Sequence, residues 1–337
     1  MLLAAGLGKR LRPLTYLMPK PLSPVLNRPV MEHGLRRLHQ HGFTEVVSNI
    51  SYMPERIKEA FGDGSGLGVK ITWSEEDAPL GTAGGVRRVA DFLGETESFL
   101  IISGDGLTDI DLSAMRDAHE AHGGIGTLAT KQVVDTTEFG VVITGEDGRI
   151  QGFQEKPDPA EALSNLANCG IYMFRREIFD HFPGPGHTSP AGDADQPPGF
   201  VDWAMDVFPA LLENDVPFYS HEIDAYWNDI GNVAELVLGN FDALAGAVSL
   251  EPGAPRVTDG VYAAESADLD RAKVTPPVLV GDDVELGDGV ELHGPVVVGD
   301  GARVGAGARL RDALLLPGAE LGAGAVMMGG AYGLDRA

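Results

Sequence analysis

The chain has 337 residues and carries 25 Lys and Arg side chains against 50 Asp and Glu, which gives a formal net charge of −25. A surface so acidic repels polyanions, so we expect neither nucleic acids nor anionic membranes as partners. The length suggests about two domains at roughly 150 residues each, and the single cysteine, Cys169, excludes an internal disulfide and a cysteine-based zinc cluster.

The first hundred residues predict alternating strands and helices. Short apolar runs that end in turn residues predict strands, and amphipathic periods of 3.6 residues predict helices. We expect strands at 1–5, 45–50, 69–73 and 99–102, and helices at 30–42, 54–61 and 82–93. This alternation is typical of a mostly parallel, doubly wound α/β sheet. Ligands of such sheets bind beyond the carboxyl ends of the strands, where Gly6 and Asp105 would face one cleft.

The later part of the chain contains two aperiodic segments. Residues 184–199 are rich in Pro, Gly, Asp and Ser, which predicts a surface loop. Residues 251–276 predict an irregular linker. We therefore expect a first domain at 1–245, a linker at 246–277 and a third segment at 278–330.

That third segment contains a six-residue repeat. Apolar residues recur six apart at Val280, Leu286, Leu292, Val298, Val304, Leu310 and Leu316, and the phase then slips by one residue to Leu321 and Met327. Such a repeat predicts a short left-handed parallel β-helix of two to three coils at about 18 residues each. We interpret it as a structural or oligomerising appendage, and we therefore expect a homo-oligomer. An acyltransferase site is disfavoured, since only His293 could serve it as a base.

The opening of the chain concentrates glycine and positive charge. Residues 1–37 hold seven basic side chains and one acidic one, a local charge of +6. The turn Gly6-Leu7-Gly8-Lys9-Arg10 directly follows the first predicted strand, and Pro19-Lys20-Pro21 comes soon after. Glycines let backbone N–H groups approach phosphate oxygens, which Arg10 and Lys20 can neutralise. The turn matches neither a P-loop nor a full dinucleotide fingerprint, so it predicts a site for a small, multiply charged anion.

Further blocks follow in order: Gly81-Thr82-Ala83-Gly84-Gly85, Gly104-Asp105, and a run from Glu155-Lys156-Pro157 through Asn168-Cys169-Gly170 to Trp227-Asn228-Asp229-Ile230-Gly231. On these blocks the chain resembles the sugar-1-phosphate nucleotidylyltransferases over nearly all of residues 1–245, most closely the mannose-1-phosphate guanylyltransferases. A hexapeptide tail is a common appendage in that family. The resemblance implies a Rossmann-like, doubly wound mixed sheet followed by the β-helix.

The resemblance also implies a reaction and a set of site residues. A phosphate oxygen of the sugar 1-phosphate attacks the α-phosphorus of a nucleoside triphosphate, and pyrophosphate leaves. Catalysis is assigned to Arg10, Lys20, Asp105 and Asp229, with both carboxylates holding Mg²⁺. The implied nucleotide-binding residues are Leu3, Ala4, Ala5, Gly6, Gly8, Lys9, Arg10, Glu76, Gly81 and Thr82. The implied sugar-phosphate-binding residues are Gly140, Glu155, Lys156 and Asn168.

The nucleobase depends on Glu76. Guanine presents two adjacent donors, which one carboxylate accepts together, whereas uracil and thymine present one N–H between two acceptors, which suits an amide. Relatives that use thymidine or uridine nucleotides tend to have Gln at this position. We therefore expect GTP, with an acidic loop residue as the alternative interpretation, and mannose follows from the resemblance alone. A UDP-glucose or dTDP-glucose pyrophosphorylase stays open.

The chain differs from the family it resembles in two features of its opening segment, and a non-catalytic protein is a competing functional class. The first strand is two to four residues shorter than in the family, and Lys9 replaces the usual Thr or Ser. A non-catalytic sugar-nucleotide sensor would tolerate loss of the four catalytic residues, yet all four are present. Without a leader or an apolar run near the ~20 residues of a membrane helix, we expect a cytoplasmic protein with small-molecule substrates.

Overall fold

The computed structural model describes residues 1–192 and 196–333, which form two compact units. Unit 1 contains Met1–Gly6, Leu35–Gly106 and Ile110–Trp227, and unit 2 contains Leu7–Gly34, Leu107–Asp109 and the chain from Asn228 onward. Of the loop expected at 184–199, residues 193–195 lie outside the described residues. Within the described ranges, no helix is long and apolar enough to cross a membrane. The predicted domain limits at 245 and 277 stay a prediction.

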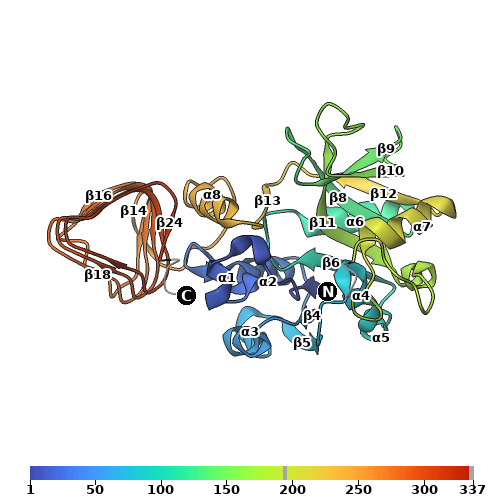
Figure 1. Cartoon of the computed structure of the whole chain (residues 1–337), viewed down its shortest axis with the longest axis horizontal. Coiled ribbons are helices and arrows are strands. Elements are labelled where there is room, and N and C mark those ends of the chain that lie inside the picture. Colours follow the sequence, from blue (N-terminus) through green and yellow to red (C-terminus); the bar gives the residue numbers. More distant parts are fainter. Residues whose placement is uncertain (193–195, 334–337) are drawn as a thin grey trace. The chain divides into compact units, whose positions relative to one another are not determined.

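Unit 1 is built on a nine-stranded sheet (Figure 1). Its strands are β1 (Leu2–Leu3), β4 (Glu45–Ile50), β5 (Lys70–Glu75), β6 (Ser98–Ser103), β8 (Gly126–Gln132), β9 (Gly140–Thr144), β10 (Ile150–Glu155), β11 (Leu166–Arg175) and β12 (Phe218–Glu222). They lie in the order β10-β9-β11-β6-β1-β4-β5, while β8 pairs with β11 and β12. The helices of unit 1 are α3 (Pro54–Phe61), α4 (Gly81–Arg88), α5 (Ala90–Leu93), α6 (Leu112–His122) and α7 (Phe208–Glu213), and α2 (Val30–Gln40) begins in unit 2 and ends in unit 1.

One half of this sheet confirms the predicted parallel arrangement. β1 lies between β4 and β6 and is parallel to both, and β4 is parallel to β5. The apolar run Phe99–Ile102 of β6 is buried along its whole length, as expected for a strand covered on both faces. Predicted elements agree with the structure within about two residues, except that the helix expected at 82–93 is divided at Val89 into α4 and α5.

The other half of the sheet is antiparallel. β11 is antiparallel to β6, β8 and β9, and β9 forms a hairpin with β10 through a turn at Gly148, whose φ is +78°. Only β12 and β8 pair in parallel there. The expectation of a mostly parallel sheet is therefore wrong for residues after 103, and the expectation of a mixed sheet is confirmed. An Asp147-Gly148 pair between two strand-like runs is the sequence signal of this hairpin.

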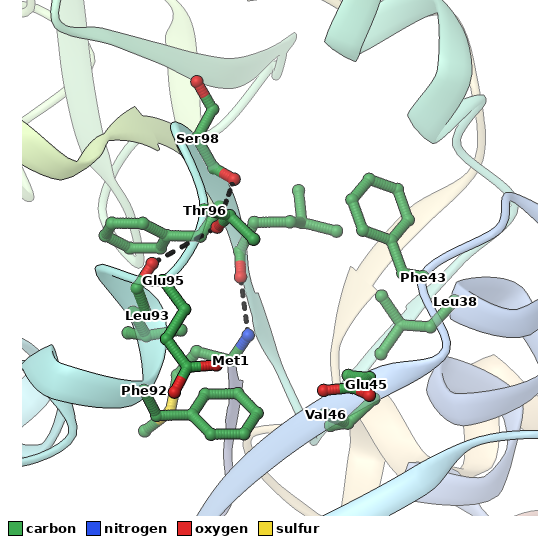
Figure 2. A pocket seen from close by; sticks show the side chains of 12 residues that line it. Met1, Leu38, Phe43, Glu45, Val46, Phe92, Leu93, Glu95, Thr96 and Ser98 are labelled. Atoms are coloured by element: carbon green, nitrogen blue, oxygen red, sulfur yellow. Dashed lines mark hydrogen bonds between the residues drawn. The ribbon is translucent and has the colours of Figure 1, made fainter.

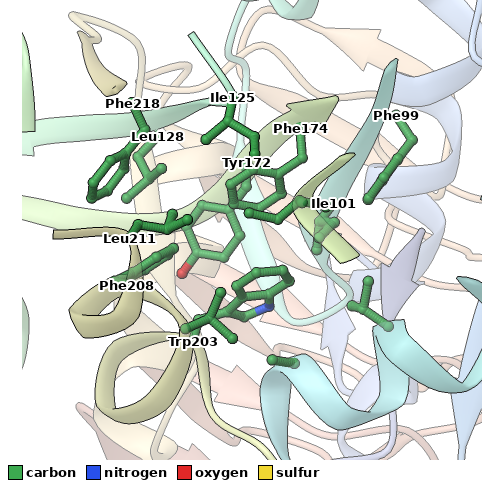
Figure 3. Close-up of a cluster of buried hydrophobic side chains, with 14 of the residues drawn as sticks. Phe99, Ile101, Ile125, Leu128, Tyr172, Phe174, Trp203, Phe208, Leu211 and Phe218 are labelled. Carbon is green, nitrogen blue, oxygen red and sulfur yellow. The ribbon is translucent and has the colours of Figure 1, made fainter. Parts of the chain in front are cut away.

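An aromatic cluster fills the core beside the antiparallel half (Figure 3). Trp203 stacks on Phe174 with ring centroids 4.8 Å apart, and Phe208 lies between Trp203 and Phe218. Trp203 begins a short π-helical turn, Trp203–Val207, which runs directly into α7. This cluster therefore anchors the segment that precedes α7.

Two histidines of α6 are held in the neutral form inside unit 1. His122 Nδ1 accepts from the Gly124 N–H at 2.9 Å, so its Nε2 must donate to Thr127 Oγ1 at 2.7 Å. Thr127 in turn contacts Nδ1 of the fully buried His119, whose Nε2 faces Ser98. Burial, with smaller contributions from His122 and Arg175, lowers the pKa of His119 to about 4.

Acid should therefore destabilise unit 1 through His119. Because the folded pKa is depressed, the stabilisation is complete above the unfolded value of about 6.5 and is lost as the pH falls toward about 4, which amounts to about 3 kcal/mol. Urea unfolding at pH 7 and pH 4.5 measures this loss. His119→Gln should reduce the difference between the two pH values, whereas His181→Gln, outside the cluster, should leave it unchanged. An equal pH difference in the wild type and His119→Gln would contradict the assignment.

Unit 2 contains the parallel β-helix, whose stacked coils are visible in Figure 1. Its strands are β14 (Arg256–Thr258), β15 (Val261–Ala263), β16 (Lys273–Thr275), β17 (Val278–Val280), β18 (Glu285–Leu286), β19 (Glu291–Val298), β20 (Arg303–Val304), β21 (Arg309–Leu315), β22 (Glu320–Leu321), β23 (Val326–Met328) and β24 (Ala331–Tyr332). Apart from β14, which is antiparallel to β15, the stacked strands are parallel, and the repeat residues point into a common apolar core. The segment 251–276, which we expected to be irregular, contributes three of these strands.

The phase slip of the repeat has a local cause. Val278 pairs with Val296, 18 residues on, but Val296 pairs with Ala313, only 17 residues on. The two residues Gly294 and Pro295 face the single residue Asp312, which adopts a φ of +50°. Leu315, rather than Leu316, is therefore the partner of Val298. The slip is real, but it lies between Leu310 and Leu315 and not after Leu316.

Candidate functional site

A cavity of about 290 Å³ lies at the carboxyl ends of four neighbouring parallel strands of unit 1. The residues that follow β1, β5 and β6 line it together with the first turn of α4. Seven predicted site residues are among them: Leu3, Ala5, Gly6, Glu76, Gly81, Thr82 and Asp105. The prediction that Gly6 and Asp105 face one cleft is thereby confirmed. Ala4 is buried behind the cavity, where its N–H donates to Asn49 Oδ1 at 3.0 Å.

The glycines of the Gly81–Gly85 block are required by close packing. A Cβ at Gly81, whose φ is +81°, would lie 2.4 Å from the Val201 carbonyl oxygen, and one at Gly84 would lie 2.6 Å from the Gly199 carbonyl oxygen. The same Val201 oxygen accepts from the N–H groups of Ala83 and Gly84, both at 2.9 Å. The block therefore seats the start of α4 on the segment 199–203, which is over a hundred residues away in the sequence.

Thr82 is fixed by that same segment. Its hydroxyl donates to Asp202 Oδ2 at 2.8 Å and accepts from the Trp203 N–H at 3.1 Å. Asp202 also caps the π-helical turn through its other oxygen, which accepts from the N–H groups of Ala204 and Met205. The Thr82 side chain thus lines the cavity in a fixed orientation, with the aromatic core directly behind Trp203.

Glu76 is a buried carboxylate, only 4% exposed, at the wall of the cavity. Its Oε1 accepts from Asn49 Nδ2 at 2.8 Å, and its Oε2 accepts from the Leu80 N–H at 2.9 Å. Each carboxylate oxygen can accept more than one hydrogen bond, so both retain capacity toward the cavity. The alternative interpretation of an acidic loop residue in solvent is therefore wrong for Glu76. Glu75, beside it, is exposed and pairs with Lys58.

Asp105 follows β6 by two residues and lines the same cavity. One of its carboxylate oxygens accepts from the Ser103 hydroxyl. A Cβ at Gly104 would lie 2.9 Å from the Leu3 carbonyl oxygen, so glycine is needed where this turn passes β1. The turn therefore directs Asp105 toward the Gly-rich segment at the end of β1.

The remaining catalytic candidates meet in unit 2. Lys20 Nζ lies 3.5 Å from Asp229 Oδ1, and Arg10 Nη2 lies 3.9 Å from Asp229 Oδ2. Lys20 is nearly buried, with 11% of its side chain exposed, against 56% for Arg10. A Cβ at Gly231 would lie 3.0 Å from Arg10 Nη2. Two motifs from the opening of the chain thus meet the carboxylate of Asp229, which belongs to a third motif more than 200 residues further along the chain.

Backbone geometry supports this cluster. Gly8 has a φ of +59°, and a Cβ there would lie 2.9 Å from Thr15 and 3.1 Å from Lys20, so the Gly-rich turn packs directly on the lysine stem. Thr15 Oγ1 donates to the Gly8 carbonyl oxygen at 2.9 Å. Lys9 begins a short 3₁₀ turn that ends at Leu11 and has no acidic residue in its first turn.

A second cavity of unit 1, of about 470 Å³, brings together three of the four predicted sugar-phosphate residues. Gly140, Glu155 and Asn168 line it. Lys156 does not; it has a φ of +46° and lies 3.8 Å from Glu155 in a half-exposed ion pair. Asn168 donates to Tyr172 Oη at 3.0 Å and accepts from the Gly170 N–H at 3.1 Å. Cys169 is buried, which raises the pKa of its thiol, as expected for a packing residue.

Part of the lining of this second cavity is apolar. It is formed by Ala204 and Met205 of the π-helical turn and by Pro209 and Leu212 of α7. One segment thus serves both cavities, because Asp202 holds Thr82 while Ala204 and Met205 line the second cavity. Sequence reasoning missed Asn49 and Asp202, because their hydrogen-bond partners are distant in the chain and no local pattern marks them.

A third cavity lies at the opposite, amino-terminal edge of the parallel strands (Figure 2). Phe43, Phe92 and Leu38 line it together with the carboxylates of Glu45 and Glu95. No Lys or Arg side chain is among the described residues around it. Phosphate groups would meet repulsion there, so this cavity does not suit the predicted substrates.

Comparison with known families decides the class. Residues 1–245 match the family model described as "Nucleotidyl transferase", and residues 277–312 match six bacterial transferase hexapeptide repeats. The chain belongs to the nucleotidyl transferase family. It is therefore an enzyme of that class, which confirms the family resemblance seen in the sequence.

Two relatives from the family illustrate its range. The chain is 36% identical to a UTP–glucose-1-phosphate uridylyltransferase of Synechocystis, over 86% of this chain and 75% of that protein. It is 33% identical to a mannose-1-phosphate guanylyltransferase of Mycobacterium tuberculosis, over 86% of this chain and 76% of that protein. Family membership alone therefore does not select the base or the sugar.

Solved structures support the fold. A putative glucose-1-phosphate thymidylyltransferase of Bacillus anthracis aligns with a TM-score of 0.62 at 24% identity, over 74% of this chain and 96% of that one. HddC of Yersinia pseudotuberculosis, complexed with GMP-PN, aligns with a TM-score of 0.57 at 19% identity, over 71% and 96%. At these identities the two family members establish the shared architecture.

Proposed function

We propose that this nucleotidyl transferase joins a sugar 1-phosphate to the nucleotidyl group of a nucleoside triphosphate, with GTP and mannose 1-phosphate as its preferred pair. An oxygen of the sugar phosphate forms a bond to the α-phosphorus, and the bond from that phosphorus to the β-phosphate oxygen breaks. GDP-mannose and pyrophosphate are the products. The observation that carries the proposal is the single cavity shared by Gly6, Glu76 and Asp105.

Guanine is proposed because of Glu76. Its carboxylate is held by two hydrogen bonds at the cavity wall, and each oxygen can still accept one of the adjacent donors, N1–H and the 2-amino group. An amide at this position would offer one acceptor and one donor. A buried carboxylate therefore favours guanine over uracil and thymine.

Catalysis in this proposal rests on positioning and charge neutralisation. Lys20 contacts the reacting phosphates, and Arg10 contacts the leaving pyrophosphate. Both are supported by the convergence of the two cations on Asp229. The backbone of Gly6 and Gly8, together with Lys9, approaches the triphosphate.

Mg²⁺ is proposed as the cofactor, held by Asp105 and Asp229. Carboxylate oxygens suit this hard cation, which keeps water and phosphate oxygens as its other ligands and neutralises the charge that develops on them. Within residues 1–192 and 196–333 no cluster of three or more metal-binding side chains is present. Two carboxylates completed by substrate oxygens fit that donor set.

The sugar is assigned to the second cavity. Glu155, Asn168 and the backbone of Gly140 offer polar contacts to hydroxyls on one side, and the apolar wall suits the C–H face of a pyranose. Lys156, beside Glu155, contacts the sugar phosphate. The proposal for mannose itself rests on the guanylyl resemblance.

UTP with glucose 1-phosphate is the second candidate pair. The Synechocystis relative, 36% identical, is described as using that pair, and the thymidylyl counterpart shares the fold. In that case Glu76 would act only in holding Leu80 and Asn49.

Pyrophosphate release measured over a matrix of substrates tests the proposal. GTP, UTP, dTTP, ATP and CTP are each combined with mannose, glucose and N-acetylglucosamine 1-phosphates, with Mg²⁺ and with EDTA. We expect the highest kcat/KM for GTP with mannose 1-phosphate, and none of the pairs should react in EDTA. A maximum at UTP with glucose 1-phosphate would replace the preferred pair by the second one. No turnover in any combination would overturn the proposed reaction.

A further inference from the structure

We propose that Asn49 is a positioning residue for the nucleotide, because it joins the Gly-rich turn to the base-contacting carboxylate; this rests on the proposed function. Asn49 lies at the carboxyl end of β4 and is 3% exposed. It lines the nucleotide cavity, yet its amide is directed at protein groups on both sides. Its role is to fix the groups that contact the substrate.

Three hydrogen bonds in series connect three separate segments. The Ala4 N–H, at the end of β1, donates to Asn49 Oδ1 at 3.0 Å. Asn49 Nδ2 donates to Glu76 Oε1 at 2.8 Å. Glu76 Oε2 accepts from the Leu80 N–H at 2.9 Å, one residue before α4. The end of β1 that leads into the Gly-rich turn, the proposed base-contacting carboxylate and the start of α4 are thus held by one relay.

The relay demands an amide at position 49. The group facing Ala4 must accept and the group facing Glu76 must donate, and a short amide supplies both. Space there is closed, since a Cβ at Gly85 would lie 2.6 Å from Asn49 Nδ2 and 2.7 Å from Glu76 Oε1. A side chain of another size or with another donor pattern would therefore displace Glu76 or the turn.

Exchanging donor and acceptor tests the relay. In Asn49→Asp, two carboxylates face each other. In Glu76→Gln, the amide oxygen still accepts from the Leu80 N–H, so the NH₂ group of the new side chain faces the NH₂ group of Asn49, and two donors meet. In the double variant, Gln at 76 donates to Asp at 49, and the bonds to Ala4 and Leu80 are retained. Each single variant should raise the KM for the triphosphate about 5- to 100-fold, as expected for an unsatisfied buried group, and leave the KM for the sugar 1-phosphate unchanged. In the double variant, the KM should return most of the way to the wild-type value when it is measured with the triphosphate that this variant uses best.

Ser48→Ala is the matched control. Ser48 is the neighbouring buried residue of β4, and its Oγ donates to the Leu2 carbonyl oxygen at 2.9 Å, so its loss also weakens the contact of β4 with β1. Ser48 does not line the cavity. This variant should lower the melting temperature without raising the KM for the triphosphate. An equal rise in that KM would mean that Asn49 acts only through general stability, which overturns the proposal.

Two readouts separate the relay from the proposed substrates. Thermal unfolding of the wild type, both single variants and the double variant measures the coupling without any turnover. If the losses of the single variants simply add in the double variant, the relay is overturned. If stability and KM recover but the preference for GTP over UTP persists in the double variant, the relay stands and the assignment of guanine to Glu76 fails.

Discussion

Replacing Lys20 with methionine is expected to lower kcat for nucleotidyl transfer about 10²–10³-fold, the usual cost of removing one preorganised charge-stabilising group. Lys20 is nearly buried and lies 3.5 Å from Asp229, so its ammonium is already held where the proposed reaction develops negative charge. Methionine keeps the aliphatic stem against which Gly8 packs, so the turn itself should persist. Steady-state pyrophosphate release with saturating substrates measures the change.

Lys273→Met provides the matched control for this exchange. Lys273 is an exposed lysine of the same unit and pairs with Glu291 on the β-helix, far in sequence from any proposed site residue. It should retain wild-type kcat. A Lys20→Met enzyme with kcat within about threefold of the wild type and an unchanged melting temperature would remove Lys20 from the catalytic set.

Elements of the fold that depend on local pattern could be predicted from the sequence. The strands at 45–50 and 99–102 and the helix at 54–61 combine clear periodicity with turn residues at both ends, and the structure places them within two residues. The direction of β11 could not be predicted in this way. It pairs with three strands at once, and pairing partners are chosen by tertiary packing that no local pattern encodes.

In the hexapeptide repeat, too, the local pattern predicts the elements but not how their residues pair. Periodicity identified the β-helix and the existence of a slip, yet it placed the slip at Leu316. Three consecutive leucines, Leu314–Leu316, all satisfy an apolar pattern, so the sequence alone cannot say which of them faces inward. The compression at Asp312, with its φ of +50°, decides it in favour of Leu315.

The candidate site was predicted through its motifs, and its supporting groups were missed. Gly6 and Asp105 could be named because they follow strands whose carboxyl ends meet at one edge, whereas Glu76 was named through the family resemblance. Asn49 and Asp202 are single polar residues within ordinary-looking segments. Their importance arises from hydrogen bonds to Glu76 and Thr82, which only the folded chain brings close.

The Gly81–Gly85 block is both a motif that is recognisable in the sequence and a packing site that only the folded chain reveals. In the sequence the block served only as one of the motifs of the family resemblance, whereas its glycines prove to be sites of close approach by Val201, Gly199 and the Asn49–Glu76 pair. The block packs the start of α4, and hence Thr82, against a distant segment, and in the proposed function this packing supports nucleotide binding. Damage to this packing should therefore appear in both stability and nucleotide binding.

Gly81→Ala is accordingly expected to destabilise unit 1 by about 3 kcal/mol, from left-handed backbone strain and overpacking combined. The new Cβ would lie 2.4 Å from the Val201 carbonyl oxygen, which cannot move without loosening its hydrogen bonds from Ala83 and Gly84. The KM for the triphosphate should rise, because the first turn of α4 lines the cavity. Urea unfolding and initial rates measure the two effects.

Gly42→Ala isolates the contribution of the clash. Gly42 has the same φ of +81° as Gly81, but a Cβ there meets nothing within 4 Å. This control should therefore show only the backbone strain, about 1 kcal/mol, with an unchanged KM for the triphosphate. Equal destabilisation by the two substitutions would show that α4 can shift away from Val201 at little cost. In that case the seat on residues 199–203 would not be what holds Thr82 at the nucleotide cavity.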